Sequence, residues 1–280
     1  MAAQWRKIRD WPVLYLEALD EKGVARITFN RYEKRNALSV ELIESCLEAL
    51  EEVRSNQSIQ VVITRGGGGV YSAGLDLHDL GSVTRARLAD WDRPTPGTQL
   101  YETVRTFPRI MIAQIQGYCL GGAVALLNSH DLAVAASNAQ IGMPEILRGS
   151  YGQSVTATLF HAGIPFKKLS LLQLGGRNLT GVEAERLGLV SEVVDEAELE
   201  AHTTTLATEI ASRHPAALRH AKIAVHLGRD VPLPHALQID RLVTARMQTE
   251  VDAFGDLDSY LESQKGGPNV SYRRPDTSQQ

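Results

Sequence analysis

The chain has 280 residues, of which 43% are hydrophobic, and its formal net charge at pH 7 is −4. This length is sufficient for one large domain, or for a domain with an appendage, around a sizeable core. Nucleic acid is disfavoured as the main partner, because the lysines and arginines form no basic stripe that could follow a phosphate backbone. The two cysteines, Cys46 and Cys119, stand in apolar surroundings, which argues against a disulfide framework or a thiolate metal site and favours a reducing compartment.

No membrane or targeting segment is predicted. No apolar run approaches the roughly 20 residues that a membrane span needs, and the first residues, MAAQWRKIRDW, lack the apolar stretch of a secretory signal. We therefore expect a cytoplasmic protein. His78, His130 and His161 lack the paired spacing of metal ligands, so we expect no metal site.

The first third of the chain alternates between strand and helix patterns. Residues 23–30 (GVARITFN) are rich in β-branched and apolar residues and predict a strand. Ser39 is a suitable helix N-cap, and the apolar residues that follow it recur at helical spacing with glutamates between them. Residues 59–66 (IQVVITRG) form a short apolar run that is typical of a buried parallel strand.

The middle of the chain continues this alternation after an irregular stretch. Residues 81–99 hold glycines, prolines and Trp91 without periodicity, which predicts a long loop or lid. Residues 109–117 and 131–137 predict further strands with a helix between them. The alternation favours parallel strands joined by right-handed crossovers, so the predicted fold class is α/β. From about residue 200 the pattern is helical, and the last residues have the composition of a mobile terminus.

Two glycine segments are candidate binding sites for an oxygen atom. Gly121 and Gly122 separate a strand pattern from a helix pattern, so unpaired N–H groups at the helix start could face an incoming oxygen. Gly74 follows another strand and could bring a second N–H to the same oxygen, which would complete an oxyanion hole. Taken alone, a glycine pair is more often a packing or turn feature. The stretch RGGGGVYSAG lacks the patterns of phosphate-binding loops.

Five segments, in this order, resemble the crotonase superfamily, also called the enoyl-CoA hydratase/isomerase family. They are ITFNRYEKRNALS, VYSAGLDL, QIQGYCLGGAVAL, DLAVAASNAQIGMPEILRG and LTGVEAERLGLVSEVV, within residues 12–265. The resemblance implies a spiral of ββα units in residues 1–200, which carries an acyl-CoA site, and a helical oligomerisation region in residues 201–280. It also implies a homotrimer or a dimer of trimers, an acyl-CoA thioester as substrate, and no tightly bound cofactor beyond the coenzyme A of that substrate.

The resemblance also assigns site residues by position. The N–H groups of Leu75 and Gly122 would hold the thioester oxygen. The residues implied to line the coenzyme A groove, or to lie near its adenine, pantetheine and phosphates, are Lys34, Arg35, Ala37, Ala73, Gly74, Asp76, Leu77 and Gly121. Near the C-terminus, Tyr260 matches an aromatic residue that in relatives reaches the coenzyme A of a neighbouring subunit. Ser263 stands where a lysine is common, and we expect Lys265 to compensate.

The catalytic acids depart from the hydratase pattern. Hydratases of the family usually place one glutamate in the helix after the glycines and another in a turn similar to Q-P-E. Here the first position is Ala125, and the second is Glu145 in IGMPEIL. Two carboxylates can divide the work of activating water and protonating carbon, whereas one carboxylate suits proton removal at C2 and return at C4 of a 3-enoyl-CoA. We therefore favour isomerisation slightly over hydration with one glutamate.

Several alternatives stay open at this point. Hydroxycinnamoyl-CoA hydratase-lyases, a related subgroup of the family that this chain resembles, also lack the first acid and still add water and cleave a carbon–carbon bond. The apolar neighbours of Glu145 would raise its pKa toward that of a useful base, although Pro-Glu is also common in first helical turns. Tyr151 could replace the missing acid or simply pack. A thioester or carbon–carbon hydrolase, and a relative that binds acyl-CoA without catalysis, are the remaining possibilities.

Overall fold

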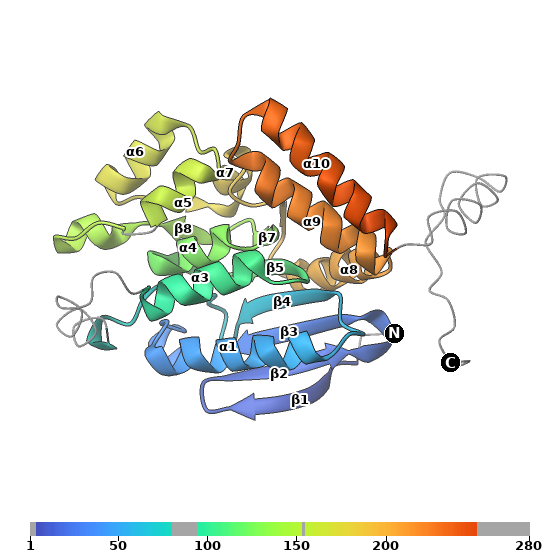
Figure 1. Cartoon of the computed structure of the whole chain (residues 1–280). Helices are drawn as coiled ribbons and strands as arrows, with labels where there is room; N and C mark the ends of the chain where they lie inside the picture. The colour runs from blue at the N-terminus through green and yellow to red at the C-terminus, as the bar shows by residue number, and fades with distance from the viewer. Residues whose placement is uncertain (1–3, 80–93, 153–154, 251–280) are drawn as a thin grey trace. The chain divides into compact units, whose positions relative to one another are not determined.

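The computed structural model describes residues 4–79, 94–152 and 155–250 (Figure 1). These residues belong to two compact units, Met1–Ala207 and Thr208–Gln280. The described part of the first unit contains the sheets and the residues of the predicted oxyanion hole, and the described part of the second is helical. The oligomerisation role expected for residues 201–280 stays a prediction.

A seven-stranded sheet forms the core of the first unit, in the order β1-β2-β3-β4-β5-β7-β10. Its strands are β1 (Arg6–Trp11), β2 (Leu14–Leu19), β3 (Val24–Phe29), β4 (Val61–Gly66), β5 (Ile110–Ile115), β7 (Leu132–Ala136) and β10 (Glu192–Val194). From β3 onward neighbouring strands pair in parallel, whereas β1, β2 and β3 pair antiparallel. The predicted α/β class is confirmed, and the four strands predicted from the sequence are β3, β4, β5 and β7.

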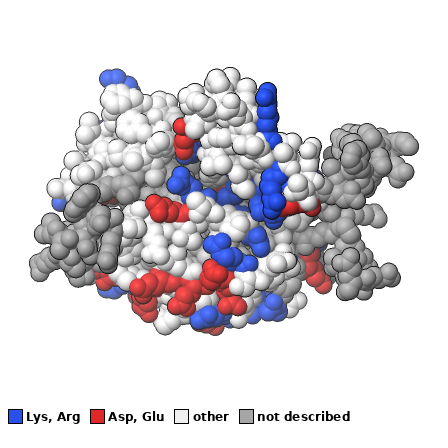
Figure 2. Space-filling model, viewed as in Figure 1, with Lys and Arg blue, Asp and Glu red and all other residues white. Residues whose placement is uncertain are grey.

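Helix α1 (Val40–Ser55) packs on this sheet. It begins where predicted, because Ser39 Oγ accepts a hydrogen bond from the N–H of Leu42 at 3.2 Å and so caps the helix. Its buried side, which includes Leu42, Cys46 and Leu50, faces strands β2 and β3, and α1 lies beside α3 (Figure 1). Acidic side chains gather over α1 on its solvent side (Figure 2). The helix is therefore amphipathic, as its sequence pattern indicates.

The sequence pattern does not predict a second, three-stranded sheet, which consists of β6 (Tyr118–Leu120), β8 (Gln140–Gly142) and β9 (Asn178–Thr180). Each strand has three residues, too few to display an alternation of apolar and polar positions. Strand β6 pairs in parallel with β8, and β8 pairs antiparallel with β9. This sheet positions the site, because β6 leads into Gly121 and β8 leads toward Glu145.

Residues 96–99, which the sequence analysis assigns to a long loop, are the start of helix α3 (Pro96–Thr106). The prediction is wrong for this end of residues 81–99, and residues 80–93, with Trp91, lie outside the described residues. The side chain of Thr95 caps the helix by accepting from the N–H of Thr98 at 3.0 Å, and Pro96 occupies the first turn, where no N–H is needed. Leu100, Tyr101 and Val104 then follow at helical spacing and are buried.

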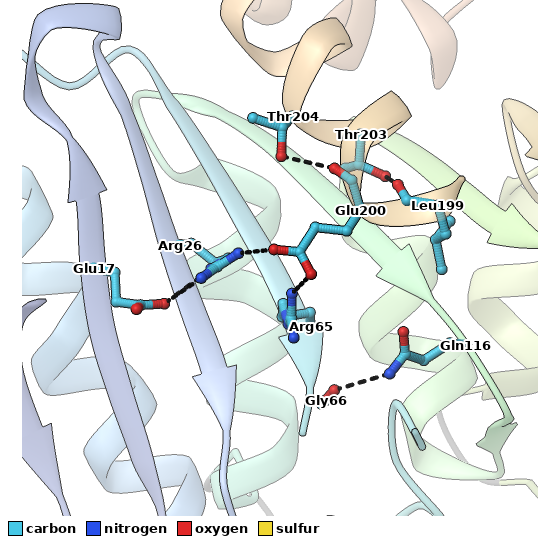
Figure 3. A network of polar contacts seen from close by, with 9 residues as sticks. All are labelled: Glu17, Arg26, Arg65, Gly66, Gln116, Leu199, Glu200, Thr203 and Thr204. Carbon is cyan, nitrogen blue, oxygen red and sulfur yellow. Dashed lines mark hydrogen bonds and ion pairs between the residues drawn. The ribbon is translucent and has the colours of Figure 1, made fainter. Parts of the chain in front are cut away.

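A buried arginine lies within the main sheet. Arg26 on β3 forms ion pairs of 2.7 Å with Glu17 on β2 and with Glu200 (Figure 3). Glu200 also binds Arg65 on β4 at 2.7 Å. Burial raises the pKa of Glu200, but hydrogen bonds and charges from Arg65 and Arg26 outweigh burial and hold this pKa below its ordinary value. The network joins three strands to the first turn of α8 (Leu199–Ala211).

The described residues of the first unit also form the helices η1 (Asp20–Lys22), η2 (Tyr32–Lys34), α4 (Gly122–Asn128), η3 (Pro144–Arg148), α5 (Val155–His161), α6 (Phe166–Gly175) and α7 (Gly181–Arg186). In the second unit, α9 (Pro215–Arg229) and α10 (Leu233–Gln248) pack against each other. The predicted change to helices near residue 200 is confirmed. Across the described ranges, no helix has both the length and the apolar character that a membrane crossing requires.

Candidate active site

Three chain segments meet beyond the carboxyl ends of the parallel strands. The segment after β4 pairs with the segment after β3, since the N–H of Leu38 donates to the carbonyl oxygen of Gly74 at 2.8 Å. The same segment pairs with β6, since the N–H of Leu120 donates to the carbonyl oxygen of Ser72 at 3.1 Å. Ligand sites in α/β sheets commonly lie at this edge. Backbone pairing alone therefore brings both predicted glycine segments together.

The backbone geometry at positions 74 and 121 requires glycine. Both have positive φ angles, 95° and 54°, which residues other than glycine rarely adopt. A Cβ atom on Gly74 would lie 2.6 Å from the carbonyl oxygen of Leu120, and one on Gly121 would lie 2.7 Å from Oε1 of Glu145. The glycines thus allow the three segments, and the carboxylate, to approach one another closely.

The two predicted oxyanion donors point to a common region. A Cβ atom on Gly74 would lie 3.3 Å from the nitrogen of Gly122, and a Cβ atom on Gly122 would lie 3.4 Å from the nitrogen of Leu75. Within the described chain, neither the N–H of Leu75 nor that of Gly122 donates to a protein acceptor, although their neighbours Asp76 and Gly121 do. Two unpaired N–H groups from separate segments are what an oxyanion hole requires.

Glu145 lies beside these donors, on the 3₁₀ helix η3. The N–H of Gly121 donates to the carbonyl oxygen of Gly142 at 2.9 Å, and this bond aligns the glycine turn with the segment that carries Glu145. Oε2 of Glu145 is buried and has no hydrogen-bond partner in the described part of the chain. Burial raises the pKa of this carboxyl group, while its own backbone N–H and the charge of Arg148 partly oppose the shift. Glu145 is therefore suited to accept a proton.

Ala125 lies in the first turn of α4 and is fully buried. It follows Gly122 by three residues, a spacing that places two residues on the same side of a helix. Its methyl group can neither accept nor donate a proton. Among the described residues, the candidate catalytic groups predicted from the sequence are thus one carboxylate and two backbone donors.

Tyr101 on α3 is a site residue that the sequence analysis missed. Its side chain is buried, and its Oη lies 2.8 Å from the position that a Cβ atom on Gly122 would occupy. Burial raises its pKa well above the ordinary value, and the negative charge of Glu145 raises it further. The Thr-Pro start of α3 and the helical spacing of Leu100, Tyr101 and Val104 are the signals that could have located it.

The predicted coenzyme A residues near β3 lie on a tightly fixed loop. Lys34 and Arg35 are exposed, Ala37 is half-buried, and the carbonyl oxygen of Arg35 accepts from the N–H of Ala73 at 2.9 Å. Arg35 itself adopts a left-handed conformation with φ 51°. These positions leave the two basic side chains accessible to an anionic ligand, and their role in binding stays a prediction.

Asp76 holds this loop in place. It forms an ion pair of 2.7 Å with Arg31 and accepts a hydrogen bond from the N–H of His78 at 2.9 Å. Burial raises the pKa of Asp76, but its hydrogen bonds with Arg31 and His78 outweigh burial and lower the pKa below its usual value. The side chain is therefore engaged with the protein, and only the surrounding backbone is left for the predicted contact with coenzyme A.

Two other predicted residues have exposed side chains. Leu77 is exposed, and Tyr151 is 56% exposed. The negative charge of Glu145 acts on Tyr101, whose pKa it raises. The proposed replacement of the missing acid by Tyr151 stays a prediction. Tyr260 and Lys265, with Ser263, lie outside the described residues.

Comparisons with known proteins identify the family to which this chain is similar. Residues 20–267 match the profile of the enoyl-CoA hydratase/isomerase family. The chain is 33% identical over 232 residues to the Bos taurus "Enoyl-CoA hydratase domain-containing protein 2, mitochondrial", with 80% of this chain and 77% of the relative covered. It is 28% identical over 215 residues to the hydroxycinnamoyl-CoA hydratase-lyase of Pseudomonas fluorescens, with 76% and 77% covered.

A crystal structure of an enoyl-CoA hydratase from Mycobacterium smegmatis superimposes with a TM-score of 0.82 at 22% identity, covering 90% of this chain and 97% of that one. This likeness supports the α/β fold, while the ββα spiral and the trimer stay predictions. Because the bovine relative is named as mitochondrial, the cytoplasmic location also stays a prediction. The family match covers most of the chain, from the strands of the main sheet to the C-terminal helices. The protein therefore belongs to the enoyl-CoA hydratase/isomerase family of the crotonase superfamily.

Proposed function

We propose that the protein isomerises an enoyl-CoA by moving a proton between C2 and C4 of the acyl chain, with Glu145 as the acid/base. The observation that carries the proposal is the half-buried carboxylate of Glu145, whose Oε2 is buried without a partner among the described residues, beside two unpaired N–H donors, with Ala125 where a second acid would stand. Glu145 removes a proton from C2 of a 3-enoyl thioester. The electrons move to the thioester oxygen, and the protonated Glu145 returns the proton at C4, which gives the 2-enoyl product.

The N–H groups of Leu75 and Gly122 make the proton at C2 acidic enough to remove. Both groups are held by backbone pairing before substrate arrives, so they need no reorganisation when negative charge develops on the oxygen. One such donor contributes about 3 kcal/mol to transition-state stabilisation in other enzymes. Coenzyme A enters as part of the substrate, beside the loops that hold Lys34 and Ala73, and no tightly bound cofactor is needed.

The test is to incubate the protein with a 3-enoyl-CoA in D₂O and to follow the conjugated product by absorbance and deuterium incorporation by mass. Glu145→Gln should lower the rate at least about a hundredfold, because a general base contributes at least that much. Affinity for the thioester should change little. Glu102→Gln, an exposed glutamate on α3, serves as the matched control and should retain full activity. A Glu145→Gln protein that keeps wild-type activity contradicts the assignment.

Addition of water with one glutamate is the second candidate. It is favoured by the likeness to a hydratase-lyase, since that relative is named for water addition and bond cleavage. The same experiment with 2-enoyl- and feruloyl-type CoA thioesters separates the two reactions, because hydration adds 18 mass units and cleavage shortens the acyl group. Tight binding of every thioester without deuterium exchange would instead indicate a protein that binds acyl-CoA without catalysis.

A further inference from the structure

The hydroxyl of Tyr101 is a buried polar group without a partner. The residue is only 7% exposed, and no atom of the described residues forms a hydrogen bond with its Oη. Most buried polar groups in folded proteins are hydrogen-bonded, because an unpaired one lowers stability. A phenylalanine would fill the same space without this cost. The hydroxyl therefore calls for a partner beyond the described residues, and a bound substrate can supply one.

The hydroxyl lies in the candidate active site. A Cβ atom on Gly122 would meet Tyr101 Oη at 2.8 Å and the nitrogen of Leu75 at 3.4 Å, so the hydroxyl and a predicted oxyanion donor flank one point. A Cβ atom on Gly97 would lie 3.3 Å from the Leu75 side chain and 3.4 Å from Tyr101 Oη. Small residues at 97 and 122 thus leave room beside the hydroxyl.

Helix α3 fixes this hydroxyl in position. Leu100 and Val104, on the same helix, are fully buried and anchor it in the core. Thr95 caps the start of the helix. A donor on a rigid element is effective in catalysis, because it does not have to be ordered when substrate binds.

We propose that Tyr101 is a third donor of the oxyanion hole, whose hydroxyl donates a hydrogen bond to the thioester carbonyl oxygen alongside the N–H groups of Leu75 and Gly122. This inference rests on the proposed function and extends it by one substrate-contacting residue. The phenol acts as a neutral donor, because burial and the nearby charge of Glu145 both disfavour its ionised form. It therefore polarises the carbonyl and does not replace the proton-transferring glutamate that is missing at Ala125.

The experiment compares wild type with Tyr101→Phe, using butyryl-CoA labelled with ¹³C at its carbonyl carbon. Binding to wild type should lower the carbonyl stretching frequency, and binding to Tyr101→Phe should lower it less. The kcat for the enoyl-CoA should fall about tenfold or more in Tyr101→Phe, because loss of an oxyanion donor acts on the transition state. Tyr15→Phe, which removes a hydroxyl on β2 outside the site, should match wild type in both measurements.

Thermal unfolding separates this role from a structural one. The melting temperature of Tyr101→Phe should equal or exceed that of wild type, because no hydrogen bond to a described residue is lost. A lower melting temperature together with an unchanged carbonyl frequency would overturn the inference, as would an unchanged kcat. If wild type polarises the carbonyl but does not isomerise the enoyl-CoA, the proposed reaction fails while the role of Tyr101 stands. If wild type does not bind the thioester, both proposals fail.

Discussion

At the scale of single residues, the surroundings of Glu145 decide its chemistry. Burial makes its charged form less favourable, and Oε2 finds no donor within the described ranges that would compensate. A glutamate of this kind accepts a proton more readily than an exposed one. Its own backbone N–H and the charge of Arg148 partly oppose this rise in the pKa of Glu145.

Arg148→Met should move the acid limb of the pH profile of kcat/KM to higher pH. The positive charge of Arg148 lowers the pKa of Glu145, so its removal raises that pKa, and the deprotonated base is lost earlier as pH falls. Because Arg148 is exposed, the shift is best measured at low ionic strength. Arg177→Met, which removes another exposed arginine, is the control. A shift to lower pH would contradict the expectation.

Gly121→Ala should abolish most of the activity. The new methyl group would strain a backbone with φ 54° and displace Glu145 Oε1, which lies 2.7 Å from its position. Gly188→Ala introduces a methyl group at φ 74° with nothing within 4 Å, so it imposes backbone strain of about 1 kcal/mol without touching the site. Both variants should lose stability in urea unfolding, but only Gly121→Ala should lose more than about tenfold in kcat. Equal activities would show that Gly121 does not position Glu145.

At the scale of elements, the ion network of Arg26 ties β2, β3 and β4 to the start of α8 (Figure 3). Arg26→Met should reduce the free energy of unfolding by about 3 kcal/mol, because it leaves the poorly exposed Glu17 without a counter-charge. Arg9→Met breaks exposed pairs on β1 and should cost less than about 1 kcal/mol. Urea unfolding measures both. Similar losses would mean that burial of the network has little effect on stability.

Elements also differ in how well the sequence predicts them. Strand β4 is long enough to be identified by its apolar run. Helix α1 is long enough to be identified by the helical spacing of its apolar residues and by its cap, Ser39. Helix α3 begins within a stretch that contains Pro94, Pro96 and Gly97, and residues of these types are typical of loops. Its cap and its apolar spacing are therefore weaker signals in the sequence than those of α1. The three-residue strand β6 has no periodicity of its own, and only its partners β8 and the Ser72 segment define it.

At the scale of the whole molecule, the expected trimer or hexamer stays a prediction. Apolar side chains on α9 and α10 are exposed in the single chain; they are Ile223, Val225, Leu227, Leu233, Leu237 and Leu242. Large exposed apolar groups of this kind are typical of protein interfaces. Their location in the second unit is therefore compatible with the oligomerisation role that the family resemblance implies for residues 201–280.

The sequence by itself determined the α/β class, four strands of the main sheet and the family, and it predicted Glu145 as the lone carboxylate, because periodicity and ordered motifs are local properties of the chain. Only the tertiary structure brought Tyr101 to Leu75, Gly122 and Glu145 and left both its hydroxyl and the two N–H groups unpaired among the described residues. These groups come from separate elements, and their proximity depends on how β6 pairs with its neighbours and how α3 packs. Such long-range pairing reflects the free energy of the entire core, which no short stretch of sequence encodes.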